Sequence, residues 1–95
     1  LALCLEGLGR TWGVAGRPAV AAQLLGAAAA LREAQGSPLH PAERAAYDRD
    51  LAAARAQIDE PTWAAAWAQG RALDGVAASA YARAVVAGTQ EPGDA

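Results

Sequence analysis

Alanine makes up 29 of the 95 residues of this chain. It is the strongest helix former and has the smallest apolar side chain of the standard set, so this composition favours closely packed helices over a β-rich fold. Three tryptophans, two tyrosines and a limited number of leucines and valines must then supply the bulk of the core. A chain of this length makes one small domain or a piece of a larger protein.

The charge balance and the cysteine content exclude several functional classes. Acidic residues and arginines are interspersed at a net charge of −2, so the chain lacks the clustered basic residues of a nucleic-acid surface. The longest uncharged stretch, 18–31, is shorter than the ~20 apolar residues of a membrane span. A lone cysteine, Cys4, cannot form an internal disulfide, so a reduced cytoplasmic setting is expected.

Apolar periodicity predicts two helices in the first third of the chain. The first spans about 1–15 and ends at a glycine-rich turn. Its apolar positions are Leu1, Leu5, Leu8 and Trp12. Pro18 suits the first turn of the second helix, and Gly36 suits a left-handed cap at its end. The apolar stripe of this second helix is Val20, Leu24, Ala28 and Leu31.

Three further helices follow a loop over 36–41 that contains two prolines. The third helix runs from Pro41 to about Ile58, and its apolar face is Tyr47, Leu51, Ala54 and Ile58. Asp59 is the predicted N-cap of a fourth helix that Gly70 closes, and Asp74 caps a fifth that runs to about Val86. Residues 89–95 lack apolar periodicity and are predicted to form a linker or a disordered tail. We therefore expect an all-α domain over 1–88.

Large and small residues in 1–35 follow the spacing of a tetratricopeptide repeat. The matching positions are Leu5, Leu8, Gly9, Trp12, Ala21, Leu25 and Ala28. The small residues among them would let two antiparallel helices approach closely, while Leu25 and Trp12 would fill the groove between the helices. Residues 36–88 lack the Leu-Gly pair of the pattern, so they are predicted to form a degenerate or terminal repeat.

Longer motifs between residues 24 and 73 carry a more particular resemblance. They read Leu-Leu-Gly-Ala-Ala-Ala-Ala-Leu-Arg-Glu, Pro-Leu-His-Pro-Ala-Glu-Arg-Ala-Ala-Tyr-Asp-Arg and Trp-Ala-Ala-Ala-Trp-Ala-Gln-Gly-Arg-Ala-Leu. This segment resembles the C-terminal tetratricopeptide-like region of large actinobacterial ATPase-type transcriptional regulators, of the LuxR-like or antibiotic-regulatory kind. Such regulators combine a nucleotide-binding domain, a helical repeat array and a DNA-binding domain.

The resemblance implies a non-enzymatic module for protein–protein contact, self-association or effector sensing. Its partners would be other domains of the same regulator and a second copy of itself, because the end of an array exposes the apolar face that its neighbour would cover. Signal binding along the array would shift the equilibrium of an ATPase switch.

No residue pattern in the chain predicts catalysis, a cofactor or a metal. Trp12 occupies the place of the third glycine of a dinucleotide fingerprint, and a phosphate-binding P-loop needs a lysine, which the chain lacks. His40 is the only histidine, so it is interpreted as a loop or capping residue rather than a member of a triad or metal site. Cys4 is interpreted as a small core residue.

Two alternatives for binding remain open. Trp63 and Trp67 are four residues apart on one helix face, which is typical of core residues but also suits a partner surface or a small-molecule pocket. The last two helices could instead form a DNA-binding helix-turn-helix element. Its base-reading side chains would be Ser79, Tyr81 and Arg83, which is a weak set for sequence recognition.

Overall fold

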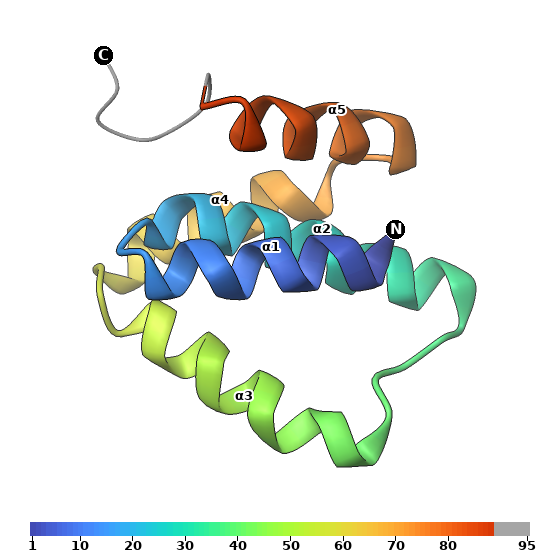
Figure 1. Ribbon diagram of the computed structural model, residues 1–95, viewed down its shortest axis with the longest axis horizontal. Helices are drawn as coiled ribbons and strands as arrows, with labels where there is room; N and C mark the ends of the chain where they lie inside the picture. The colour runs from blue at the N-terminus through green and yellow to red at the C-terminus, as the bar shows by residue number, and fades with distance from the viewer. Residues whose placement is uncertain (89–95) are drawn as a thin grey trace.

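Five α-helices joined by short connections make up residues 1–88, the part of the chain that the computed structural model describes (Figure 1). They are α1 (Ala2–Val14), α2 (Pro18–Gln35), α3 (Pro41–Arg55), α4 (Glu60–Arg71) and α5 (Gly75–Val86). No strand occurs among these residues, so the predicted all-α class is confirmed. The predicted tail at 89–95 lies outside the described residues.

Capping residues fix most helix boundaries where the sequence predicts them. The side chains of His40, Asp59 and Asp74 each accept a hydrogen bond from a backbone N–H in the first turn of α3, α4 and α5, respectively. Gly36 ends α2 in the left-handed conformation, with φ of 62°. A side-chain acceptor satisfies a backbone N–H that the helix itself leaves without a partner, which is why these positions start helices.

Two predicted boundaries differ in the structure. α3 ends at Arg55 rather than near Ile58, because the chain turns at 56–58 and the Gln57 side chain donates to the Gly13 carbonyl at the end of α1 (2.7 Å). Gly70 does not close α4; it lies inside the helix, which continues to Arg71. The reason lies in the packing of α4 on α2.

α2 and α4 cross with their backbones in close contact. A Cβ atom added to Gly70 would lie 2.8 Å from the carbonyl carbon of Gln23 and closer still to its oxygen. Across the same crossing, a Cβ on Gly26 would meet the backbone of Trp67. Both glycines sit within helices, where glycine is unfavourable relative to alanine, and the close approach explains their presence.

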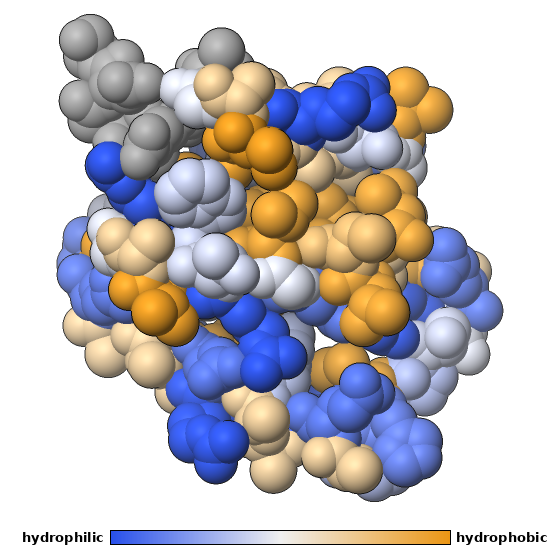
Figure 2. Space-filling model, in the orientation of Figure 1, coloured by the Kyte–Doolittle hydropathy of each residue, from blue (hydrophilic) through white to orange (hydrophobic). Residues whose placement is uncertain are grey.

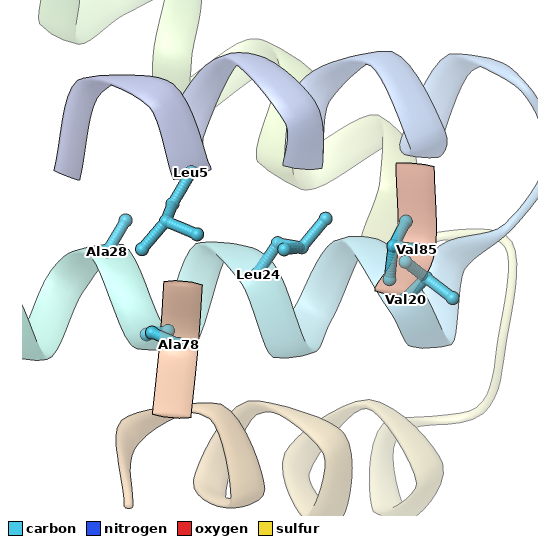
Figure 3. Close-up of a cluster of buried hydrophobic side chains, with 7 residues drawn as sticks. Leu5, Val20, Leu24, Ala28, Ala78 and Val85 are labelled. Carbon is cyan, nitrogen blue, oxygen red and sulfur yellow. The ribbon is translucent and has the colours of Figure 1, made fainter. Parts of the chain in front are cut away.

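α2 is the central helix of the domain. α1 and α4 have the most extensive packing on it, whereas α3 packs mainly on α1, and α5 covers another side of α2 (Figure 1). Two groups of buried side chains result. The first cluster lies between α1, α2 and α5 and contains Leu5, Val20, Leu24, Ala27, Ala28, Ala78 and Val85 (Figure 3). The second cluster lies between α2, α3 and α4 and contains Ala21, Ala22, Leu25, Tyr47, Ala54, Trp63 and Ala66.

The predicted first repeat corresponds to α1 and α2, which lie side by side (Figure 1). A Cβ on Gly9 would lie 2.8 Å from Leu25 Cγ and 3.4 Å from the Ala21 carbonyl oxygen, so the small residue is needed at this contact. α3 and α4 do not form an equally extensive pair, because α4 packs on α2 and α3 on α1. Within residues 1–88, no helix has both the length and the apolar character to cross a bilayer.

Candidate functional site

A cleft of about 750 Å³ lies between α3, α4 and the C-terminal half of α2. The loop 36–39 and one residue of α1, Glu6, complete its lining. In the space-filling view the surface is hollowed between α3 and the body of the molecule (Figure 2). A volume of this size is typical of pockets that hold one small molecule.

One face of each flanking helix lines the cleft. The lining residues of α3 are Arg44, Tyr47, Asp48, Leu51 and Arg55. Those of α4 are Trp63, Ala64, Trp67 and Arg71. Spacings of three and four residues place each set on a single helix face. Each face therefore combines apolar or aromatic side chains with an arginine at its C-terminal end.

Trp63 and Trp67 form a stacked pair in the wall of the cleft. Their ring centroids are 6.2 Å apart, with 23° between the ring planes. Trp63 is only 3% exposed, whereas Trp67 is partly exposed and packs against the second cluster. The pair thus belongs to the core and also offers indole surface to the cleft.

A partly buried ion pair also lines the cleft, where Arg32 of α2 forms two hydrogen bonds with the carboxylate of the buried Glu6. The Nη2 to Oε1 distance is 2.8 Å, and Arg32 also donates to the Ser37 carbonyl oxygen (3.0 Å). The hydrogen bond to Glu6 raises the pKa of Arg32. Burial, together with the nearby charge of Glu6, raises the pKa of the Tyr47 hydroxyl.

Two further ion pairs lie at the rim of the cleft and join different helices. Arg71 of α4 holds Glu33 of α2 through two N–O contacts of 2.8 and 2.9 Å. Arg55 of α3 holds Glu60 of α4 through contacts of 2.5 to 3.0 Å. Hydrogen bonding to these arginines lowers the pKa of both carboxyl groups below its ordinary value. The rim thus contains two guanidinium groups, each of which binds a carboxylate in bidentate geometry.

The structure distributes the predicted repeat positions over both sides of α2. Leu5 and Ala28 belong to the first cluster, and Leu8 and Trp12 pack against it. Ala21 and Leu25 belong to the second cluster, while Gly9 contacts Leu25 across the α1–α2 seam. Trp12 and Leu25, predicted to fill one groove, therefore lie in separate clusters. None of these seven side chains lines the cleft.

The remaining chemically distinctive residues stand outside the cleft. Cys4 is exposed rather than in the core, because the buried face of α1 is formed by 2, 5, 6, 9 and 13. His40 caps α3 by accepting from the Ala42 N–H (3.2 Å), as predicted. Among residues 1–88, no group of three His, Cys, Asp or Glu side chains is placed to hold a metal ion.

The side chains expected to read DNA bases in a helix-turn-helix are not presented together. Ser79 is partly buried, and Tyr81 packs against the first cluster, where burial raises its pKa. Of the three, only Arg83 is exposed. A base-reading helix would need such side chains to project from the domain.

Sequence reasoning did not find the arginine-lined cleft or the buried Glu6. A signal for Glu6 was present, because it falls on the helical stripe that also contains the buried Ala2, Leu5, Gly9 and Gly13. A signal for Arg71 was present as well, since it follows Trp67 by four residues on one face of α4. The approach of three helices that brings these residues together has no local signature.

Comparisons with protein-family models, curated proteins and solved structures find no match to this chain. Any assignment of function therefore starts from the cleft and from the side chains that line it.

Proposed function

We propose that this chain is a non-enzymatic, effector-sensing helical module of a bacterial transcriptional regulator, and that the effector binds in the cleft between α2, α3 and α4. The observation that carries the proposal is the wall of the cleft, where the stacked Trp63 and Trp67 lie beside arginines from three helices. The regulator context, an actinobacterial protein with a tetratricopeptide-like array in the cytoplasm, rests on the resemblance of residues 24–73.

The construction of the cleft suits a sensor. A ligand in it would touch α2, α3 and α4 at once, so binding would favour the arrangement of these helices that fits the ligand best. Of the three helices that form the cleft, α3 is the one most free to respond, because only two of its residues, Tyr47 and Ala54, are buried. A displacement of α3 would reach whatever part of the regulator is packed against it.

The residues of the cleft favour binding over catalysis. Its described lining contains no histidine or cysteine, and its carboxylates, Glu6, Glu33 and Asp48, are each within 4 Å of an arginine. Hydrogen bonding to Arg71 lowers the pKa of Glu33, whereas general acid–base chemistry needs a group with a pKa near the working pH.

A thermal-shift screen with neutral, cationic and anionic aromatic compounds tests the proposal. We expect a subset of compounds to raise the melting temperature of the wild-type chain and to lose this effect in Trp67→Ala. Trp12→Phe, which alters the first cluster instead, should retain the effect. Failure of every class to stabilise the wild type, or full retention of the effect in Trp67→Ala, would contradict an effector site in the cleft.

Self-association is a second proposed function, and the exposed apolar side chains at one end of the molecule support it. Leu1, Leu3 and Val76 are exposed, and Leu1 lies beside Gly75, so the starts of α1 and α5 are adjacent. Figure 2 shows apolar surface over this region. We propose that a second copy of the chain covers it in a homodimer.

A further inference from the structure

The arginines at the rim of the cleft lie deeper than the carboxylates that they bind. The Arg71 side chain is 37% exposed and that of Glu33 is 66% exposed. For Arg55 and Glu60 the corresponding values are 49% and 62%. Each carboxylate can therefore swing into solvent while its arginine stays at the cleft.

Replacement of Glu33 by a ligand group has little energetic cost. An exposed ion pair contributes little to stability, because both ions are well solvated when they separate. The same two guanidinium N–H groups would then bind the ligand carboxylate in the geometry that Glu33 shows now. The Glu6–Arg32 pair differs, because Glu6 is buried and has no comparable access to solvent.

Position along α4 determines what else such a ligand would touch. Arg71 follows Trp67 by four residues and Trp63 by eight, so the three side chains succeed one another along a single face at about 5.4 Å per helical turn. An anion bound to Arg71 would place the adjoining part of the ligand against the exposed surface of the Trp67 indole. Flat apolar groups pack best on such a surface.

We propose that the ligand of the cleft is a small aromatic carboxylic acid whose carboxylate replaces Glu33 on Arg71 and whose ring packs on Trp67. This inference rests on the proposed effector site and adds the chemical class of the ligand. Each of the four arginines that line the cleft is paired with a carboxylate, so displacement of Glu33 leaves one positive charge, that of Arg71, for an acid to neutralise. A cationic ligand would have to displace an arginine and would meet the remaining guanidinium groups.

Isothermal titration calorimetry with three naphthalene probes that differ in charge tests the inference. The probes are 2-naphthoate, the neutral 2-naphthamide and the cationic 2-naphthylmethylammonium. We expect 2-naphthoate to bind several-fold more tightly than the amide, since its carboxylate accepts charge-assisted hydrogen bonds from Arg71, while solvent exposure and the competing Glu33 limit the gain. The cation should bind more weakly than the amide.

Variants at the rim sharpen the test. Arg71→Gln should bring the affinities for 2-naphthoate and 2-naphthamide together, whereas Arg83→Gln on α5 is the matched control and should leave both unchanged. Glu33→Gln should tighten the binding of 2-naphthoate several-fold, because it removes the competing carboxylate. A gain in affinity cannot arise from a misfolded variant.

Equal binding of the acid and the amide, tighter binding of the cation, or weaker 2-naphthoate binding in Glu33→Gln would overturn the aromatic-acid inference. The same holds if 2-naphthoate does not bind at all. The proposed effector site would survive each of these results if the broader screen yields neutral or cationic compounds whose effect depends on Trp67. The proposed effector site fails separately if no compound of any class raises the melting temperature in a way that depends on Trp67.

Discussion

Gly26 and Gly70 show how a single residue type sets the distance between two helices. Gly26 lies in the middle of α2 and Gly70 in the last turn of α4, and inside a helix alanine is favoured over glycine by up to about 1 kcal/mol. Each also lies where a Cβ atom would overlap the backbone of the other helix. Gly7 of α1 provides the contrast, because a Cβ there would meet nothing within 4 Å.

Substitution by alanine at Gly70 and at Gly7 should have opposite effects on the free energy of unfolding. Gly70→Ala forces α4 away from α2, and we expect it to lower the free energy of unfolding by about 2 kcal/mol or more. Gly7→Ala adds only helix propensity and should raise the same quantity by about 0.5–1 kcal/mol. Urea denaturation of both variants measures these changes. A Gly70→Ala variant as stable as the wild type would show that the helices do not cross this closely.

At the scale of elements, ion pairs join the ends of helices that are distant in sequence. Glu33 near the end of α2 binds Arg71 at the end of α4, and Glu60 at the start of α4 binds Arg55 at the end of α3. Because the arginines lower the pKa of both carboxyl groups, the contribution of these two ion pairs to folding stability depends on pH.

Stability should decrease as the pH falls through the acidic range. Since the pKa of Glu33 and that of Glu60 are lower in the folded chain than their ordinary value of 4.5, the unfolded chain takes up protons first. The stabilising contribution is therefore complete above the unfolded-state pKa and is lost as the pH drops through the folded-state pKa. Urea midpoints between about pH 6 and pH 3 measure this loss. The double variant Glu33→Gln, Glu60→Gln should show a shallower decline than the wild type, and an unchanged slope would contradict the assignment.

α2 and α3 differ in how firmly the rest of the chain holds them. Eight residues of α2 are buried, against two of α3. We therefore expect the backbone amides of 21–28 to exchange with deuterium about an order of magnitude or more slowly than those of 45–55, after correction for intrinsic rates. Mass spectrometry of peptides from the two helices provides the measurement. Equal protection of both would exclude α3 as the responsive wall of the cleft.

At the scale of the whole molecule, exposed apolar side chains near the starts of α1 and α5 support a homodimer. Leu3→Arg introduces a charge there and should weaken self-association by about tenfold or more in sedimentation experiments. Val14→Arg is the matched control, because Val14 is also exposed but lies at the other end of α1. A wild-type chain that stays strictly monomeric at high concentration would contradict the proposal.

The sequence by itself determined the helices of this protein. Alanine content, apolar periodicity and the capping residues His40, Asp59 and Asp74 act within a few residues of one another, so they predicted five helices and most of their boundaries. Only the tertiary structure decided which helices meet. Gly70 resembled a helix end in the sequence, yet its role is set by contact with α2, more than 40 residues earlier in the chain.

The candidate site shows the same division between local and long-range determinants. Trp63 and Trp67 stood out because their spacing is local, and the sequence left open whether they form core or pocket. The cleft around them requires Glu6, Arg32, Arg55 and Arg71 from four helices. Charged side chains in helices ordinarily indicate a solvated face, so their convergence has no local signal. The physical reason is that propensity and capping are local, whereas a cleft is formed by elements that pack across the whole chain.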